Sequence, residues 1–341
     1  MKAIAPGKLI LSGEHSVVYG RPALAMAVNR NAETLVTMDG APDRVSFELP
    51  DLGAARESFT LRALRDFHDR VARNHREFLE GRLSIRDVLH KPVELFQYAY
   101  ITLLDGLHLT MGNGAGGVNV RMRSNIPIGC GMGSSAASII SVLRGLGHYY
   151  RTEFRPEWYA RYSLEVENMQ HGRASGLDTF VSLHGGCVMF RQGEFRELPL
   201  PRMPLYIVNT GHPESSTGEA VSAVARRTGG AACALWDEFE AATLAMEKAS
   251  RENDLPAFQR AMRTNHRLLE AIGVVPARVS EFIAEAESAG AAAKVCGAGA
   301  VAGDAAGMVV VASETSPAAL CERYGYELMT VRPDPLGARI V

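Results

Sequence analysis

A short loop built on alternate glycines is the feature that most constrains how this chain can fold. Residues 129–133 have glycine at the first, third and fifth positions, and Ser134 and Ser135 follow directly. Before the loop, apolar and polar residues alternate over 118–123, which predicts a half-buried strand. After it, residues 134–146 carry small and aliphatic side chains at helical spacing. We therefore predict that this loop joins a strand to a helix.

A helix that begins at such a loop can bind an anion. Its first N–H groups have no partner within the helix, and the helix dipole places partial positive charge at the same end. Glycines let an oxyanion approach the backbone closely. Of the hydroxyl groups of Ser134 and Ser135, we expect one to cap the helix and the other to reach a metal ion or a phosphate. Phosphate binding is the favoured interpretation, with a capped structural turn as the alternative.

Two common phosphate motifs do not fit the chain. Residues 112–117 match G-x-G-x-x-G. A predicted helix precedes this run and a strand follows it, which is the reverse of the dinucleotide-binding order, so we interpret it as a turn. A P-loop requires a lysine after its last glycine, and none of the glycine loops has one there. The sequence thus favours neither a Rossmann dehydrogenase nor a P-loop NTPase.

Charged residues supply candidates for chemistry at the phosphate loop. Mg²⁺ binds one or two carboxylates together with phosphate oxygens and water. Glu167 lies near the end of a predicted helix over 158–170, and Asp178 precedes a predicted strand over 181–190. Taken alone, Glu167 could lie on a solvated helix face, and Asp178 could be a local cap. Lys8, beside the first strand, could be an edge-strand charge.

Composition excludes several classes of protein. Lys and Arg total 36 and Asp and Glu total 38, so the net charge of −2 argues against a nucleic-acid binder. Glycine is in modest excess, 33 of 341 residues, against a usual share of roughly 7%. The five cysteines form no C-x-x-C pair, so neither a zinc site nor a disulfide framework is indicated. Without a signal peptide or an apolar membrane span, we expect a soluble, cytoplasmic protein.

The chain reads as an α+β protein in two parts. Helices and strands mix without strict alternation, which argues against a doubly wound sheet. The proline-rich segment 191–204 is the best boundary, and we predict an N-terminal domain over 1–195 and a C-terminal domain over 196–341.

Several of these segments resemble one known family in order along the chain. Residues 5–20, APGKLILSGEHSVVYG, closely resemble the first motif of mevalonate kinases, within the GHMP kinase superfamily. Residues 127–137 resemble its ATP-phosphate motif. Glu167 with 171–178 resembles its Glu-x-x-x-His-Gly-x-x-Ser-Gly-x-Asp segment, residues 209–217 resemble a further family loop, and Gly297-Ala298-Gly299 resembles its third motif.

The resemblance implies a fold, an activity and residue roles. The fold would combine an N-terminal part like ribosomal protein S5 domain 2 with a ferredoxin-like C-terminal part, and the active site would lie in the cleft between them. The activity would be ATP- and Mg²⁺-dependent phosphorylation of the 5-hydroxyl group of mevalonate, in isoprenoid precursor synthesis. Asp178 and Lys8 would be catalytic, and Ser135 with Glu167 would hold Mg²⁺. ATP would contact Gly129, Gly131, Gly133, Ser134, Ser135 and Ala136, and the substrate would contact Glu14, His15, Thr217, Gly297 and Ala298.

Two departures from the family pattern leave the acceptor open. Arg173-Ala174 adds a cation where mevalonate kinases usually have Asn-Pro, and residues 299–304 replace a nearly pure glycine run. Side chains in that run would hinder a phosphate, and Asp304 would repel one if it pointed inward. The alternatives are another GHMP small-molecule kinase, acting on phosphomevalonate or a sugar, and a non-catalytic nucleotide-binding sensor. A homodimer is one alternative for the oligomeric state.

Overall fold

The computed structural model describes residues 1–108, 116–172 and 174–341. The strands are β1 (Lys2–Ser12), β2 (Ala23–Met38), β3 (Arg44–Leu49), β4 (Ala54–Thr60), β5 (Val118–Ser124), β6 (Cys187–Arg191), β7 (Glu194–Leu198), β8 (Leu205–Asn209), β9 (Ala292–Cys296), β10 (Met308–Ala312), β11 (Glu327–Met329) and β12 (Arg339–Ile340). The α-helices are α1 (Leu61–Leu79), α2 (Pro92–Gly106), α3 (Ser134–Tyr149), α4 (Pro156–His171), α5 (Leu177–His184), α6 (Thr217–Thr228), α7 (Leu235–Glu252), α8 (Leu255–Ala271), α9 (Ala277–Ser288) and α10 (Ala318–Tyr324).

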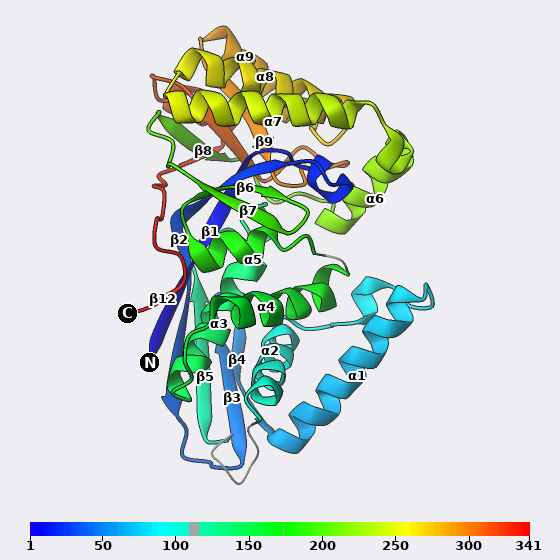
Figure 1. Ribbon diagram of the computed structural model, residues 1–341, viewed down its shortest axis with the longest axis vertical. Coiled ribbons are helices and arrows are strands. Elements are labelled where there is room, and N and C mark those ends of the chain that lie inside the picture. The colour runs from blue at the N-terminus through cyan, green and yellow to red at the C-terminus, as the bar shows by residue number, and fades with distance from the viewer. Residues whose placement is uncertain (109–115, 173) are drawn as a thin grey trace.

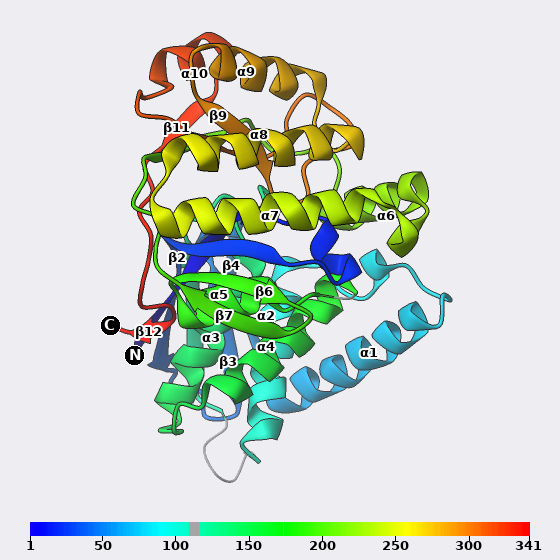
Figure 2. The same ribbon diagram turned by 45° about the horizontal axis from the view of Figure 1, so that its top comes forward.

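Two sheets organise the described chain into two layered parts. The larger sheet runs β12-β1-β2-β5-β3-β4, and β6 joins it through β2 and carries β7. The smaller sheet runs β11-β8-β10-β9 and its pairings are antiparallel. Helices α2, α3 and α4 lie over the larger sheet with α1 outside them, and α8 and α9 lie with the smaller sheet (Figures 1 and 2). Helix α7 lies between α8 and strands β1 and β2 of the larger sheet (Figure 2). The predicted α+β class is confirmed.

The long strand β2 holds the larger sheet together because it pairs with three neighbours. Within β2, residues 23–26 pair with β6 and residues 32–38 pair with β5. Strand β1 pairs with β2 along most of the length of β1. After Lys2, every residue of β1 is buried. A strand covered on both faces reads as a nearly continuous apolar run without alternation, and β1 does so apart from Lys8 and Ser12.

The chain crosses between the parts near the predicted domain boundary and again at its end. Strand β7 (Glu194–Leu198) lies across position 195 and belongs to the larger sheet. Strand β12 returns from the C-terminal part to pair with β1, Ala3 opposite Ile340. The two ends of the chain therefore lie side by side (Figure 1).

Most sequence-predicted elements are present, and one is wrong in part. The strand–loop–helix unit around residue 130 is confirmed as β5 and α3. The strand predicted over 181–190 is wrong for residues 181–184, which are the last turn of α5. Packing against β1, where the Ser182 hydroxyl donates to Pro6 O at 2.7 Å, overrides the strand signal of the apolar residues Val181 and Leu183. None of the helices in the described part of the chain is long and apolar enough to cross a membrane.

One buried ion pair joins the two parts. Lys294, in the middle of β9, is 0% exposed, and its ammonium group contacts the carboxylate of Glu14, which is 1% exposed. Lys294 Nζ also donates to Ile10 O at the end of β1, at 3.2 Å. Burial raises the pKa of Glu14, and the charge of Lys294 opposes that shift. A side chain from the smaller sheet thus satisfies polar groups of the larger one.

Removing the cation from this pair should destabilise the protein strongly. We expect Lys294→Met to lower the free energy of unfolding by about 3–5 kcal/mol, since it leaves the Glu14 carboxyl group buried without its partner. The double variant Glu14→Gln, Lys294→Met should recover most of that loss. In Lys2→Met, which breaks an exposed pair with Glu33, the change should stay below about 1 kcal/mol. Urea unfolding measures all three, and equal losses in the two single variants would contradict this interpretation.

Candidate active site

The glycine loop presents the start of α3 as predicted, but without a serine cap. Gly133 is the N-cap residue, with φ of 68° in the left-handed region, and no side chain caps the helix. The expected hydroxyl cap is therefore wrong. The Ser135 hydroxyl instead donates to Gln170 Oε1 of α4 at 2.8 Å. In the described part of the chain, the backbone N–H groups of Ser134, Ser135 and Ala136 have no hydrogen-bond acceptor. These three amides and the helix dipole make an anion site.

The glycines of this loop allow contact with the rest of the protein. A Cβ added at Gly129 would lie 2.7 Å from His212 Nε2, and one at Gly131 would lie 2.5 Å from Cys296 O. One at Gly133 would lie 3.0 Å from Lys8 Cγ. The first two partners belong to the C-terminal part. The glycines therefore let the two parts close on each other, besides leaving the backbone open to an anion.

Lys8 and Asp178 come together beside the loop. Lys8 Nζ lies 3.3 Å from Asp178 Oδ1 and donates to Gly131 O at 3.2 Å. Lys8 is 3% exposed and Asp178 35% exposed, so the ammonium group is fixed and the carboxylate faces outward. Burial alone would lower the pKa of Lys8, but Asp178 and weaker neighbours outweigh it and raise that pKa. Asp178 lies in the first turn of α5 rather than ahead of a strand.

Glu167 lies next to this pair on α4 and is 4% exposed. Its Oε2 accepts a hydrogen bond from Thr179 at 3.3 Å. Burial, and then the charge of Asp178, raise the pKa of Glu167 to about 8, against the hydrogen bonds from Thr179 and Ser135. The described residues include no group of three or more His, Cys, Asp or Glu side chains able to hold a metal ion. One buried carboxylate and one hydroxyl group fit Mg²⁺, which takes its other ligands from phosphate and water.

The third glycine loop, between β9 and β10, meets the first one directly. A Cβ on Gly297 would lie 2.9 Å from Gly131 Cα. His15 Nε2 donates to Ala298 O at 2.9 Å, and burial lowers the pKa of His15. Residues 301–304, where the family pattern is altered, are exposed. The side chain of Asp304 therefore lies in solvent, outside the contact between the two loops.

The other predicted substrate residues have different surroundings. Thr217 is the first residue of α6, after the N-cap Ser216. Together with both glycine loops it lines a narrow hollow formed by Gly129, Cys130, Gly131, Pro213, Ser215, Thr217, Cys296, Ala298, Gly299 and Ala306. The carboxylate of Glu14 is buried in the pair with Lys294, so it stabilises the backbone beside the site and does not face the hollow. Arg173, and residues 109–115 of the predicted turn over 112–117, lie outside the described residues.

The sequence pattern does not single out His212 or Lys294, which the structure places beside the candidate site. His212 comes directly after Thr210-Gly211, at the end of β8, where a loop residue can face the site. Lys294 is a charge inside an apolar strand, which signals either a partner or a buried functional group.

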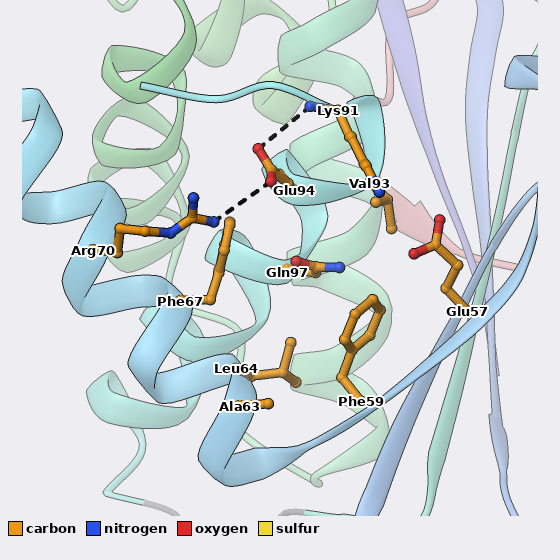
Figure 3. Close-up of a pocket in the computed structure, with 10 residues that line it drawn as sticks. All are labelled: Glu57, Phe59, Ala63, Leu64, Phe67, Arg70, Lys91, Val93, Glu94 and Gln97. Carbon is orange, nitrogen blue, oxygen red and sulfur yellow. Dashed lines mark hydrogen bonds and ion pairs between the residues drawn. The ribbon is translucent and has the colours of Figure 1, made fainter. Parts of the chain in front are cut away.

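A larger hollow of about 200 Å³ lies elsewhere, between α1, α2 and β4 (Figure 3). Phe59, Leu64, Phe67 and Val93 form its apolar lining. At its rim, Glu94 lies between Arg70 and the backbone of Lys91 (Figure 3). None of the predicted site residues lines it, so the candidate active site is the narrower place where the loops meet.

Comparisons with known proteins agree with this geometry. The profile described as GHMP kinases N terminal domain matches residues 95–186, and that described as GHMP kinases C terminal matches residues 246–303. A protein of Pyrococcus abyssi named mevalonate kinase is 31% identical over 314 residues, which are 87% of this chain and 85% of that protein. The mevalonate kinase of Thermococcus gammatolerans is 31% identical over 312 residues, 87% of this chain and 86% of the relative. The crystal structure of Methanococcus jannaschii mevalonate kinase matches the fold with a TM-score of 0.79 at 21% identity, over 98% of each chain.

A methyl group at Gly131 should disturb the contact between the loops. Gly131 and Gly193 both have positive φ, but a Cβ at Gly193 meets nothing within 4 Å. We expect Gly193→Ala to cost about 1–2 kcal/mol of stability from backbone strain alone. Gly131→Ala should cost about 1–3 kcal/mol more, because its Cβ collides with Cys296 O. Urea unfolding of both variants checks this, and equal losses would show that the loops separate freely.

Proposed function

The chain belongs to the GHMP kinase family, and from this we propose that it is a mevalonate kinase, which uses ATP and Mg²⁺ to phosphorylate the 5-hydroxyl group of mevalonate. Family membership makes it an ATP-dependent small-molecule kinase. The observation that carries the proposal is the Lys8–Asp178 pair beside the glycine loop. The relatives that are 31% identical, both named mevalonate kinases, support this acceptor.

The start of α3 supplies the phosphate site in this proposal. The free amides of Ser134, Ser135 and Ala136 donate to phosphate oxygens of ATP, and the helix dipole adds to their attraction. Gly129, Gly131 and Gly133 let the nucleotide approach the backbone. Phosphoryl transfer needs chiefly positioning and charge stabilisation, and a rigid set of backbone donors provides both.

Asp178 and Lys8 act on the acceptor. Asp178, whose carboxylate faces outward, accepts a hydrogen bond from the acceptor hydroxyl group and takes its proton as the new O–P bond forms. An aliphatic alcohol is a poor acid, so this transfer comes late. Lys8 stabilises the negative charge that grows on the same oxygen. Its bond to Gly131 O holds the ammonium group in place while the reaction proceeds.

Glu167 and Ser135 are the proposed ligands of Mg²⁺. When bound, Mg²⁺ offsets the charge of the phosphate oxygens. Glu167 suits this role because its carboxylate is buried beside Asp178, with only neutral hydrogen-bond donors in direct contact. The Ser135 hydroxyl can turn from Gln170 toward a cation, since it lies half-buried at the surface of the loop.

Further substrate contacts are proposed where the third glycine loop and α6 meet the first loop. His15, Thr217, Gly297 and Ala298 would line the acceptor or phosphate site there. Glu14 contributes indirectly, since its pair with Lys294 fixes the backbone that carries His15. A cytoplasmic location, a small-molecule substrate without a nucleic-acid partner, and domains over 1–195 and 196–341 stay predictions from the sequence.

A panel of acceptors tests the proposal. We expect coupled ADP release with Mg²⁺ and ATP when mevalonate is supplied, and none above background with phosphomevalonate, galactose or homoserine. Turnover confined to one of the last three would assign a different GHMP kinase activity. ATP binding without turnover on any acceptor would make the chain a nucleotide-binding sensor.

Replacing the proposed base should reduce turnover selectively. In Asp178→Asn, kcat should fall by about 10²–10⁴-fold because proton acceptance is lost. Its affinity for ADP should stay within about threefold of the unmodified protein, since Asp178 faces the acceptor. Asp66→Asn, on the exposed side of α1, is the matched control and should retain full kcat. Steady-state kinetics and ADP titration make the comparison, and near-normal turnover in Asp178→Asn would remove this residue from the mechanism.

The raised pKa of Glu167 predicts how Mg²⁺ dependence changes with pH. The pKa of Glu167 is about 8, so at lower pH its carboxyl group holds a proton that a metal ion must displace. With saturating ATP, the apparent affinity for Mg²⁺ should therefore rise about fivefold from pH 7 to pH 8 and only about twofold more toward pH 9. Glu167→Gln should bind Mg²⁺ weakly at every pH. Mg²⁺ titrations of activity measure both proteins, and a flat profile for the unmodified protein would contradict the assignment.

A further inference from the structure

His212 faces the end of the glycine loop that is remote from the Lys8–Asp178 pair. His212 lies between β8 and α6. Its Nε2 is so close to Gly129 that a Cβ added at Gly129 would lie 2.7 Å from it. Lys8 and Asp178 both lie against Gly133 at the other end. Under the proposed function, the Gly133 end would face the transferred phosphoryl group, and the Gly129 end would be left for the part of the nucleotide that remains in ADP.

The imidazole ring of His212 is held at one nitrogen and open at the other. Nδ1 donates to Pro213 O at 2.8 Å. In the described part of the chain, Nε2 has no hydrogen-bond partner, and the side chain is exposed. A neutral ring with its proton on Nδ1 presents a lone pair at Nε2, whereas a protonated ring presents an N–H donor there.

We propose that His212 binds the nucleotide through its Nε2, taking up a proton as it donates a hydrogen bond to a phosphate oxygen retained in ADP. This inference rests on the proposed function, because it needs the nucleotide on the glycine loop. It gives His212 a role in holding the donor, separate from the roles of Lys8 and Asp178 at the acceptor.

Few titratable groups around His212 compete with a phosphate for this role. On the glycine loop, burial raises the pKa of Cys130, so its thiol carries no charge. The carboxyl group of Glu214 lies against Gly303 in the third loop, and on α6 Glu219 is held by Arg86 and Ser216. Asp304 is exposed. The described residues form no ion pair with His212, so an incoming phosphate would be its first full counter-charge.

Proton uptake makes nucleotide affinity depend on pH in a definite direction. Free histidine side chains titrate near about pH 6.5, and a phosphate beside the ring favours its charged form. When the ring starts without its proton, binding has to bring one onto it, so affinity for ADP falls as pH rises. The affinity for ADP falls by at most about tenfold per pH unit. It stops falling above the pKa that His212 has in the complex with ADP.

The experiment follows His212 itself with metal-free ADP, which keeps Glu167 and Mg²⁺ out of the comparison. The Cε1–H signal of His212 is identified by NMR as the histidine signal that disappears in His212→Gln. Its titration midpoint should move upward by at least about one pH unit when ADP is added. Calorimetry at pH 7.5 in HEPES and in Tris should show proton uptake with ADP, which His212→Gln loses.

Three variants separate a phosphate ligand from a structural role. His212→Ala should bind ADP at least about tenfold more weakly at pH 6.5 and nearly as well as the unmodified protein at pH 8.5. His212→Gln keeps a neutral donor, so its affinity should fall less and should not depend on pH. His90→Asn, at an exposed histidine before α2, should behave as the unmodified protein does. Thermal melting confirms that each variant is folded.

The outcomes test this inference separately from the proposed kinase activity. ADP binding with an unmoved His212 midpoint, or with proton uptake that persists in His212→Gln, overturns the inference and leaves the kinase intact. Failure of the unmodified protein to bind ADP or ATP at any pH overturns the proposed function, and the inference with it.

Discussion

The buried ion pair between Glu14 and Lys294 is the interaction on which the geometry of the site depends. Glu14 precedes His15 directly, and Lys294 lies three residues before Gly297, so each partner leads into a loop of the candidate site. Moving two charges out of water is costly, and such pairs persist only where geometry and further hydrogen bonds compensate. Here Ile10 O supplies one further bond. The pair thereby sets how the smaller sheet meets the larger one, and with it where Ala298 meets His15.

The glycine loops depend on that alignment. Gly131 lies against Cys296 and Gly297 because β9 is held in place by Lys294, two residues before Cys296. Met308 N also donates to Cys130 O at 3.2 Å, which fixes the loop to the start of β10. An alternate-glycine pattern is commonly explained by close approach of a phosphate. In this protein the same glycines are also required by contact between the two parts.

The sequence could predict what is local in this site and little of what is distant. The order of strand, glycine loop and helix follows from patterning within 118–146 and is confirmed. The strand predicted after Asp178 is wrong over residues 181–184, because α5 is only eight residues long and is stabilised by contact with β1. The partner of Glu14 lies 280 residues away, which no pattern of spacing reveals. His212 likewise becomes a candidate site residue only through its contact with Gly129, which belongs to the N-terminal part of the chain.

The charge balance around Lys8 favours a further cation at the candidate site. Lys8 provides one positive charge, whereas Asp178 and Glu167 would provide two negative charges if both were ionised. In a poorly solvated place that excess is unfavourable, and the pKa of Glu167 rises to about 8 in response. A divalent cation at Glu167 would restore the carboxylate and leave Asp178 paired with Lys8, free to accept a proton from an alcohol. In the proposed mechanism, the same imbalance would link metal binding at Glu167 to the protonation of Asp178, through the charge repulsion between the two carboxylates rather than through a change of fold.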